Sequence, residues 1–532
     1  MLTRLIIFFF TLLFVLTGCS SATDKTAALA TPNSDSPRPF TVQVLGINDF
    51  HGQVLPNNTR GGMYNLAAHL IKAIESTEDH TFIVHAGDHV GASPAESALS
   101  QDEPSISFLN YVAEYCKTGR DASCHVLGTA GNHEFDEGTP EMLRLLNGGN
   151  HVKGPFLDAQ WHGATYPTLS ANVFDRNTGK LILPPYIIHE VNGVPIGFIG
   201  LTLDYTPDLV VPGMVDDLRF VDQALVAKRY VDLLQQQGIE SIVIVVHDGA
   251  GDKYYSGSTQ NTARIDKHSP FGQFLAQLPN AVDLVVTGHS HRFTNAYFTR
   301  KGVPDLLVTQ AFSSGRAYAD ITLTINPTSQ DVTQARATVH FANDAPTDSV
   351  STTGKQTLAH IETLIANAVD YAKTYTDAII GTYQPTADEP PLGQFIANSH
   401  HAILQTDMAI MNSGGVRASL QPGPITWGDL FAVQPFNNQL VVRQFTGAQL
   451  QTLINERHYW SSNVVLENEG NILWQGQTLN ADQTYTVGGN AYIMNSKAFA
   501  VGKLLRVGEL DIDATRAYIQ SLGPVFSYNS LP

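Results

Sequence analysis

Five short hydrophobic runs in the first 300 residues each stop just before an aspartate, asparagine or histidine. They occupy residues 42–47, 82–86, 126–130, 242–246 and 282–287. Runs of this length, rich in Val and Ile, predict buried strands. The polar side chains that follow them are Asp49, His51, Asp88, Asn132, His133, His247, His289 and His291. Strand ends that each carry a polar side chain predict the carboxyl edge of a sheet bearing a metal centre. The alternative, five unrelated strand ends, needs five coincidences in one half of the chain.

Between these runs the hydrophobic spacing changes to that of helices. Residues 63–75, 105–116 and 222–237 carry apolar side chains at helical intervals. Residues 186–201 instead form two short apolar runs joined at Val191-Asn192-Gly193-Val194, which is a hairpin signal. Strands alternating with helices, with an interposed hairpin, predict an α/β domain with mixed sheets over residues 40–342.

The second half of the chain begins with a change of character. A patch rich in Asp, Ser and Thr follows residue 343, and residues 358–375 then form a helical run. One face of this run carries Ile361, Leu364, Ile365, Ala368 and Tyr371. Residues 343–379 are therefore predicted to be a linker with a helix. Residues 380–532 are long enough to form a second, smaller domain.

The N-terminus has the pattern of an export signal. Arg4 precedes an apolar run, residues 5–16, which is too short to span a bilayer as a helix, so the alternative of an anchor helix is disfavoured. Leu16-Thr17-Gly18-Cys19 resembles the bacterial lipobox, which implies that residues 1–19 are a lipoprotein signal peptide and that Cys19 is lipidated. Residues 20–39 are rich in Ser, Thr, Ala and Pro and predict a flexible spacer. We expect an exported protein of the periplasm or cell envelope, tethered to the membrane by lipid alone.

Composition narrows the choice of partners. The chain has 532 residues and a formal net charge of -18, which argues against binding to a nucleic-acid polymer. To bind an anionic small molecule, the protein would need positive charge at the binding site, which metal ions and a few arginines could supply. Of the three cysteines, removing Cys19 leaves Cys116 and Cys124. In an oxidising compartment these two are predicted to form a disulfide, the alternative being two buried thiols.

The polar residues at the strand ends form a plausible ligand set for two divalent cations. Such a pair of ions needs one bridging carboxylate, with oxygen and nitrogen ligands filling the remaining positions. Asp49, His51, Asp88, Asn132, His247, His289 and His291 are the candidates. This mixture suits Zn, Mn, Co or Fe better than Ca or Mg, and a set without cysteine argues against a structural zinc site.

The motifs around these residues resemble a known signature. Asn48-Asp49-Phe50-His51-Gly52, Gly87-Asp88, Gly131-Asn132-His133-Glu134, His247 and Gly288-His289-Ser290-His291 are similar, in order and spacing, to the metallophosphoesterase signature. Their surroundings resemble the bacterial 5'-nucleotidase family, whose members include UDP-sugar hydrolases and cyclic-nucleotide phosphodiesterases. The resemblance implies an N-terminal αββα sandwich with mixed sheets and a smaller α/β C-terminal domain.

The resemblance also implies roles for individual residues. One cation, with Zn, Mn or Co as the expected metals, would be held by Asp49, His51, Asp88 and His291. The other would be held by Asp88, Asn132, His247 and His289, with Asp88 as the bridge. His133 and Asp136 match the catalytic dyad of the family, in which the carboxylate holds the imidazole that donates a proton. His85 and His89 flank Asp88 and are interpreted as supporting residues rather than ligands.

The C-terminal half resembles the substrate domain of the same family less completely. Asn412 and Arg417 lie in a segment similar to the nucleotide-binding loop, and Phe436 matches one side of an aromatic clamp for the base. Tyr492 is the candidate for the other side, with core packing as its alternative. The chain departs from relatives in two places: Asn495-Ser496-Lys497-Ala498 follows Tyr492, and no arginine stands beside Leu392-Gly393.

These features predict an exported two-metal phosphohydrolase that acts on nucleoside 5'-monophosphates. The alternatives are a UDP-sugar or dinucleotide pyrophosphatase, a 2',3'-cyclic phosphodiesterase, and a surface lipoprotein that binds nucleotides without catalysis. The complete ligand set and the dyad argue against the last. The resemblance further implies that the C-terminal domain rotates about the linker helix. The sequence leaves the metal and the oligomeric state open.

Overall fold

The computed structural model describes residues 37–119, 123–251, 257–259, 265–453, 458–467 and 472–530. The predicted signal peptide, Cys19 and residues 20–36 of the predicted spacer lie outside these ranges. Across the described ranges, no helix combines the length and the hydrophobicity needed to cross a membrane. The first strand begins at Phe40, where folding was predicted to start.

The N-terminal region contains two six-stranded sheets, both mixed. The first has the order β14 (Asp331–Phe341), β13 (Ala317–Asn326), β1 (Phe40–Ile47), β2 (His80–Ala86), β3 (Cys124–Thr129) and β4 (Thr168–Leu169). The second has the order β11 (Phe293–Phe298), β12 (Leu306–Ala311), β10 (Val282–Thr287), β9 (Ser241–Val246), β7 (Val194–Leu201) and β6 (Tyr186–Val191). Strands β1 to β4 run parallel, as do β7, β9, β10 and β12, while the outer strands β13, β14, β6 and β11 pair antiparallel.

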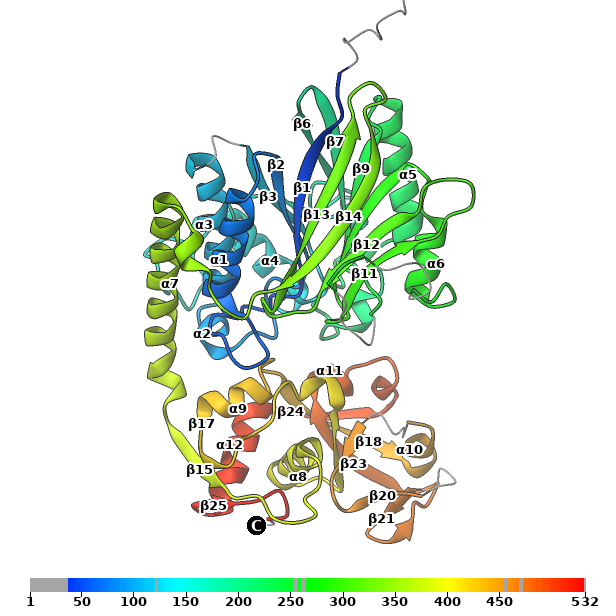
Figure 1. Cartoon of the computed structure of the whole chain (residues 1–532). Coiled ribbons are helices and arrows are strands. Elements are labelled where there is room, and N and C mark those ends of the chain that lie inside the picture. Colours follow the sequence, from blue (N-terminus) through cyan, green and yellow to red (C-terminus); the bar gives the residue numbers. More distant parts are fainter. Residues whose placement is uncertain are drawn as a thin grey trace, which may run out of the picture. The chain divides into compact units, whose positions relative to one another are not determined.

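Helices cover the outer faces of the two sheets, as Figure 1 shows. The helices of this region are α1 (Gly62–Glu75), α2 (Ala95–Ala98), α3 (Glu103–Gly119), α4 (Gly138–Asn147), α5 (Gln223–Gln236), α6 (Pro270–Gln277) and α7 (Thr352–Thr376). Of these, α1, α3, α5 and α6 pack on the sheets, and α7 packs outside α1 and α3. The predicted helices are confirmed, and α3 extends three residues beyond Cys116, where the predicted helix ended. The predicted hairpin is β6 and β7, joined at Asn192 and Gly193. A short pair, β5 (Val173–Asp175) and β8 (Leu218–Phe220), lies outside the main sheets.

Three hydrophobic clusters show why the layers stack. Apolar side chains of both sheets, among them Val44, Phe82 and Val243, pack against one another in a shared central core. The opposite face of the first sheet packs on α1, α3 and α7, and that of the second packs on α5 and α6. Strands that are buried on both faces have continuous apolar sequences, and for this reason the hydrophobic pattern predicted them. The predicted αββα sandwich is confirmed.

One expectation was wrong in detail. The five polar strand ends do not share the carboxyl edge of a single sheet. Strands β1, β2 and β3 belong to the first sheet and β9 and β10 to the second, so the edge is formed by two stacked sheets. Because both sheets are hydrophobic and buried in the same way, the sequence pattern carries no signal that separates them.

The predicted linker helix is α7, whose apolar stripe packs onto α1 and α3 of the sandwich. Ile361 and Ala368 are fully buried in that cluster, and Ile365 is half-buried against it. Ser351 caps the helix N-terminus by accepting a hydrogen bond from the backbone N–H of Gly354 at 3.1 Å. The helix ends at Thr376, and β15 begins at Ile379.

The C-terminal region has three small sheets and five helices within its described residues. The sheets are β17 (Gly423–Thr426), β15 (Ile379–Tyr383) and β25 (Val525–Phe526); β19 (His458–Trp460), β16 (Met408–Asn412), β23 (Thr484–Asn490), β18 (Gln439–Thr446) and β24 (Lys503–Leu510); and β20 (Val464–Leu466), β21 (Ile472–Trp474) and β22 (Gln477–Thr478). The helices are α8 (Leu392–Leu404), α9 (Trp427–Val433), α10 (Gly447–Leu453), α11 (Ala491–Met494) and α12 (Asp511–Ser521). This mixed region is the predicted smaller α/β domain.

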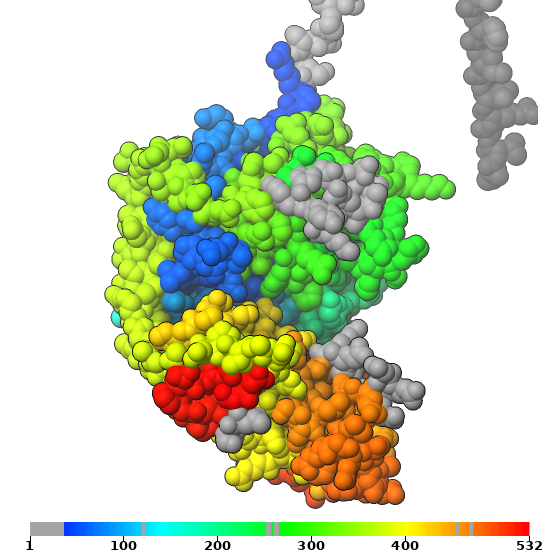
Figure 2. Space-filling model, turned by 60° about the horizontal axis from the view of Figure 1, so that its bottom comes forward, coloured from blue at the N-terminus to red at the C-terminus, as the bar shows by residue number. Residues whose placement is uncertain are grey.

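Helix α2 connects the two regions through packing. Ala95 of this helix is buried among side chains of the C-terminal region that include Phe395 and Phe431. Figure 2 shows the yellow surface that contains α9 against the blue surface of the first hundred residues, and α2 and α9 are in contact. The carboxyl edge of the sandwich therefore faces residues of the C-terminal region.

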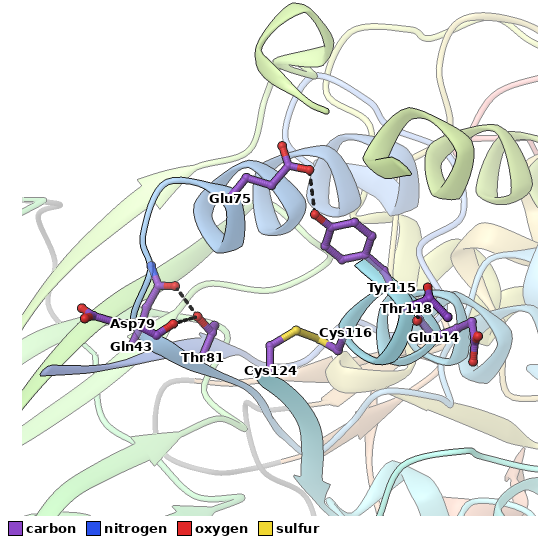
Figure 3. Close-up of a disulfide and its surroundings, with 9 residues drawn as sticks. All are labelled: Gln43, Glu75, Asp79, Thr81, Glu114, Tyr115, Cys116, Thr118 and Cys124. Carbon is purple, nitrogen blue, oxygen red and sulfur yellow. Dashed lines mark hydrogen bonds between the residues drawn. A yellow bond between two sulfur atoms is a disulfide. The ribbon is translucent and has the colours of Figure 1, made fainter. Parts of the chain in front are cut away.

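The two remaining cysteines form a disulfide in the structure. Cys116, near the end of α3, is bonded to Cys124, the first residue of β3, and their Cα atoms are 4.9 Å apart (Figure 3). Both residues are buried beneath α1. The Tyr115 hydroxyl donates a hydrogen bond of 2.6 Å to Glu75 at the end of α1, which fixes the same corner of the fold (Figure 3).

The packing of α7 can be tested by truncating its buried stripe. Ile361→Ala removes a fully buried side chain and leaves a cavity, so we expect it to lower the free energy of unfolding by about 2–5 kcal/mol. Glu362→Ala, at the exposed neighbouring position, is the matched control and should change stability by less than about 0.5 kcal/mol. Urea unfolding of residues 37–532 measures both. Equal stability of the two variants would show that α7 does not depend on this contact.

Candidate metal centre and substrate pocket

Side chains from five strand ends converge at the carboxyl edge of the sandwich. Two groups of potential ligands form there, each with its ligand atoms within 4.8 Å of one another. The first group is Asp49, His51, Asp88 and His291, and the second is Asp88, His247 and His289. Asp88 belongs to both. The groups contain the residues predicted for the two cations, with Asn132 adjoining the second.

The backbone at these positions is unusual for residues other than glycine. Five of the predicted ligands, Asp49, His51, Asp88, His289 and His291, have positive φ angles between 49° and 70°. Non-glycine residues seldom adopt this conformation, which costs free energy that the surrounding structure must offset. Left-handed residues at the end of a strand turn the chain sharply, so that nearby side chains such as Asp49 and His51 can aim at the same point. The strain is concentrated where the side chains converge.

The first group is held together by short contacts between ligand atoms. His51 Nε2 lies 2.9 Å from His291 Nε2 and 3.8 Å from Asp88 Oδ2. His291 Nε2 lies 3.4 Å from Asp49 Oδ1. Asp49, His51 and Asp88 are almost completely buried, whereas the His291 side chain is 34% exposed and forms the solvent-accessible side of the group.

The second group meets the first at the same oxygen of Asp88. His247 Nε2 is 3.0 Å from Asp88 Oδ2. Asn132 Oδ1 lies 3.2 Å from His247 Nε2 and 3.1 Å from His289 Nδ1. The Asn132 side chain, predicted as a ligand, thus joins His247 and His289. All seven predicted ligands are brought together, with Asp88 in the middle.

Hydrogen bonds to backbone carbonyls fix the ring protons of two histidines. His51 Nδ1 donates to the carbonyl of Gly91 at 2.8 Å, and His247 Nδ1 donates to the carbonyl of Ala86 at 2.7 Å. A carbonyl only accepts, so Nδ1 carries a proton in both rings. Nε2 then faces the cluster and offers a lone pair whenever the ring is neutral. Lone pairs of nitrogen and carboxylate oxygen that converge without enough protons to link them are the arrangement a divalent cation requires. The residues therefore fit two cations of the kind that accept mixed nitrogen and oxygen ligands.

Electrostatics favours neutral imidazoles around the first group. Burial, with the neighbouring His291, holds the pKa of His51 well below its usual value. Burial and Arg417 lower the pKa of His291 to about 3, and burial and His247 lower that of His289 to about 4. Burial also opposes charge on His247, but Asp88 outweighs it and raises that pKa to about 10. Three neutral rings are ready to donate lone pairs, and the proton on the fourth occupies the place of a cation next to Asp88.

Two buried residues that position the ligands were quoted in the sequence motifs but given no role there. The Asn48 side chain donates to Asp49 Oδ2 at 2.5 Å and accepts from the backbone N–H of Ala311 at 2.8 Å. Glu134 accepts hydrogen bonds from the backbone N–H groups of Asp88 at 3.0 Å, His89 at 2.7 Å and Gly131. Glu134 thus anchors the loop that presents Asp88. Their places beside Asp49 and Asn132 are the sequence signal that could have found them.

His85 and His89 are buried next to Asp88 but belong to neither group of ligand atoms. His89 Nε2 donates to the carbonyl of Ser105 at 2.8 Å, and its ring stacks on Phe50 at 5.2 Å between centroids. These contacts place His89 under the metal cluster as packing, as the sequence interpretation held.

His133 and Asp136 form a hydrogen-bonded pair beside the cluster. His133 Nδ1 lies 2.6 Å from Asp136 Oδ2, and its backbone N–H donates to Asp88 Oδ1 at 2.9 Å. Both residues lie at the 3-10 turn His133–Phe135. Burial opposes a charge on the ring, but Asp136 and Asp88 outweigh it and raise the pKa of His133 to about 9. A protonated imidazole is therefore held in a fixed direction next to the bridging carboxylate.

The predicted substrate residues line one cavity with the dyad. A cavity of about 190 Å³ is bordered by Asn132, His133, Asp136 and His289, and also by Asn412, Arg417, Phe436 and Tyr492. The Phe436 ring stacks on His133 at 5.9 Å, and the Arg417 guanidinium lies 5.8 Å from the Phe436 centroid. Tyr492 also packs partly against the hydrophobic core of the C-terminal region, as its alternative interpretation held, and its contact with a base stays a prediction.

Hydrogen bonds hold the loops that carry these C-terminal residues in place. Asn490 caps α11, which carries Tyr492, and donates a hydrogen bond of 2.9 Å to Asn412 at the end of β16. The backbone N–H of Arg417 donates to the carbonyl of Val433 at the end of α9, three residues before Phe436. Residues from different loops are thereby fixed around one cavity.

Two family models match separate segments of the chain. The family model of the calcineurin-like phosphoesterases matches residues 42–293, and the model of the 5'-nucleotidase C-terminal domain matches residues 372–468. Thus the two matched segments correspond to the sandwich and to much of the C-terminal region.

Three relatives are similar over most of the chain. Endonuclease YhcR of Bacillus subtilis is 29% identical over 92% of this chain, and cell wall protein Lmo0130 of Listeria monocytogenes is 30% identical over 84%. The chain spans 40% and 60% of the lengths of these two proteins. A 5'-nucleotidase of Vibrio cholerae is 26% identical over 83% of this chain and 78% of its own length.

A solved structure has the same fold. The 5'-nucleotidase precursor from Thermus thermophilus aligns over 92% of this chain and 100% of its own, with a TM-score of 0.66 and 20% sequence identity. The family models cover the strand ends that carry the metal ligands and the loops that carry Asn412, Arg417 and Phe436. Residues 42–293 therefore form a domain of the calcineurin-like phosphoesterases, and residues 372–468 match the 5'-nucleotidase C-terminal domain.

Proposed function

We propose that the chain is a phosphoric-ester hydrolase that uses two divalent cations and releases phosphate from nucleoside 5'-monophosphates. The observation that carries this proposal is Asp88, a buried carboxylate shared by two groups of nitrogen and oxygen ligands. When bound, two cations there would lower the pKa of a water molecule and neutralise charge on the phosphoryl oxygens. Asp49, His51 and His291 would complete one ligand sphere, and Asn132, His247 and His289 the other.

The dyad would assist the departure of the nucleoside. His133 Nδ1 faces Asp136, so Nε2 is the atom that can donate a proton or a hydrogen bond to a phosphoryl or leaving oxygen. Asp136 keeps the ring oriented and favours its charged form. The hydrogen bond from the backbone N–H of His133 to the Asp88 carboxylate fixes the distance between the proton donor and the metal centre.

The 190 Å³ cavity would receive the nucleoside. Phe436 and Tyr492 both line it and offer apolar faces to a flat base, while Asn412 and Arg417 offer polar contacts for ribose and phosphate oxygens. Arg417 is positioned next to the metal cluster, since its charge contributes to the lowered pKa of His291. This combination of an aromatic pocket and a cation beside the metals supports a nucleotide as the substrate.

The alternative of a pyrophosphatase has support from a relative's name. A protein named NAD 5'-nucleotidase from Haemophilus influenzae is 23% identical over 81% of this chain. The same metal centre could hydrolyse a phosphoanhydride if the larger substrate fits. For location, a cell wall protein and a nucleotidase precursor among the similar proteins support export. We propose an exported protein anchored through Cys19.

The role of His133 can be separated from metal binding. His133→Ala removes the proton donor but no predicted ligand, so we expect about two metal ions per chain to remain while turnover of AMP falls by about two or more orders of magnitude. His162→Ala, at an exposed histidine outside the ligand groups, is the control and should match the native protein. Metal analysis and phosphate release measure the two quantities. Loss of metal from His133→Ala would mean that this residue is a ligand.

The substrate can be tested with a panel of AMP, UMP, UDP-glucose, NAD and 2',3'-cyclic AMP. Residues 37–532, reloaded with manganese or zinc, should release phosphate from AMP or UMP, and Asp88→Asn should abolish the reaction because the shared ligand loses its charge. Nucleoside monophosphate appearing without free phosphate would favour the pyrophosphatase or the cyclic phosphodiesterase instead. Absence of turnover with two metals bound would contradict the enzymatic proposal.

A further inference from the structure

A second, larger cavity lies against the first ligand group. Its volume is about 730 Å³, and its lining includes His51 and His291 together with Arg60, Arg316 and Arg417. We call it the arginine cavity. Arg417 also lines the 190 Å³ pocket, which borders the other ligand group through Asn132 and His289. The two cavities thus approach the metal centre from its two sides, and Arg417 is common to both.

The loops that carry Arg60 and Arg316 are fastened to each other and to a ligand. The backbone N–H of Gly61 donates to the carbonyl of Ser314 at 3.1 Å, and the N–H of Ser314 donates to the carbonyl of Asp49 at 2.7 Å. A Cβ atom at Gly61 would lie only 1.9 Å from the Gly315 carbonyl oxygen, so this close approach requires glycine. Both arginines are therefore held at a fixed place relative to Asp49.

In the described part of the chain the three arginines are held by contacts other than salt bridges. Burial lowers the pKa of Arg417, and the nearby carboxylates of Asp88, Asp136 and Asp49 partly oppose that shift. Arg60 donates to the neutral Gln53 side chain at 2.9 Å. The guanidinium of Arg316 lies 4.5 Å from the centroid of Phe312, and that of Arg417 lies over Phe436. Among the described residues, none of the three forms a salt bridge with a carboxylate. Burial, and then the charge of Arg417, lowers the pKa of Arg60, which places these two cations near each other.

Acidic residues also line the arginine cavity and could in principle pair with its arginines. They are Glu96, Asp377 and Asp429. The Asp429 carboxylate is engaged in the capping box of α9, where it accepts from the backbone N–H of Thr426 at 2.8 Å. Within the described part of the chain, Glu96 and Asp377 form no salt bridge with the arginines. Within the described residues Arg60 and Arg316 have no carboxylate partner in a salt bridge. Together with Arg417, these partly buried guanidinium groups form a site suited to an anion.

We propose that the arginine cavity binds a negatively charged group on the far side of the reacting phosphorus from the nucleoside. This inference rests on the proposed function, because the nucleoside must occupy the 190 Å³ pocket and the phosphorus must lie at Asp88. A phosphodiester or phosphoanhydride then places its second substituent among Arg60, Arg316 and Arg417. The substrates favoured are nucleotides whose second substituent carries its own carboxylate or phosphate.

The chain has fewer basic than acidic residues, which leaves few cations elsewhere to bind a substrate anion. The net charge is -18, and residues 384–404, which include the start of α8 near Leu392-Gly393, contain no Lys or Arg. A substrate anion therefore finds its cations elsewhere. Arg60 and Arg316, from loops of the N-terminal sandwich, supply them next to the metal centre.

UDP-glucose and UDP-glucuronate provide a matched pair of probes, since they differ in one distal carboxylate. Binding is measured by calorimetry in metal-loaded residues 37–532 carrying His133→Ala, which suppresses turnover. We expect UDP-glucuronate to bind about fivefold more tightly than UDP-glucose, the effect of a charge-assisted contact that is partly exposed to solvent. Arg60→Gln and Arg316→Gln should each bring the ratio close to one, while Arg60→Lys, which keeps the charge, should retain part of the preference.

Arg219→Gln is the control for these variants. Arg219 also stacks on a phenylalanine, with its guanidinium 4.9 Å from the Phe174 centroid, but does not line the arginine cavity. It should leave the fivefold preference intact. If both nucleotides bind equally in the starting protein, or the preference survives both glutamine substitutions, the anion subsite is wrong while the proposed function stands. If neither nucleotide binds, both the subsite and the nucleotide substrate are wrong.

Discussion

The Asp88 carboxylate is the constraint on which the rest of the site depends. It lies almost completely buried where the two sheets meet, and its Oδ2 atom is 3.0 Å from His247 Nε2 and 3.8 Å from His51 Nε2. A carboxylate removed from water is costly unless cations or hydrogen-bond donors surround it. Here imidazoles from both sheets and the backbone N–H of His133 surround it, and two metal ions would complete its neutralisation. The sandwich of sheets thus serves to bring opposite sets of ligands to one carboxylate.

That arrangement is achieved at a cost in local stability which the fold offsets elsewhere. Five ligand residues adopt left-handed backbone conformations, and several charged groups are buried together. The central core between the sheets and the outer cores against the helices hold the strand ends rigid. Glu134 and Asn48 then fix the loops that carry Asp88 and Asp49. Rigid strands with strained ends give a preorganised site, whereas the substrate side chains come from loops of the C-terminal region.

The sequence alone predicted those parts of the structure that follow from local pattern. Apolar runs located the strands β1, β2, β3, β9 and β10, and helical spacing located α1, α3, α5 and α7. The seven candidate ligands were identified because each lies shortly after a predicted strand, and the structure brings their side chains together. The apolar pattern did not assign each strand to one of the two sheets of the sandwich that the family resemblance implied, since parallel strands buried in either sheet have the same composition. Arg60 and Arg316 were also missed, because their significance lies in two loops, some 250 residues apart, that meet only through Gly61 and Ser314. Tertiary proximity of this kind leaves no mark in a single sequence.

The claim that Asp88 bridges two cations can be tested directly by anomalous diffraction from crystals of residues 37–532 grown with manganese. The account predicts two strong anomalous peaks about 3.5–4 Å apart, one bordered by Asp49, His51 and His291 and the other by Asn132, His247 and His289, with Asp88 between them. The Asp88→Asn protein, crystallised in the same way, should lose or weaken both. A single peak, or two peaks that do not share Asp88, would contradict the account.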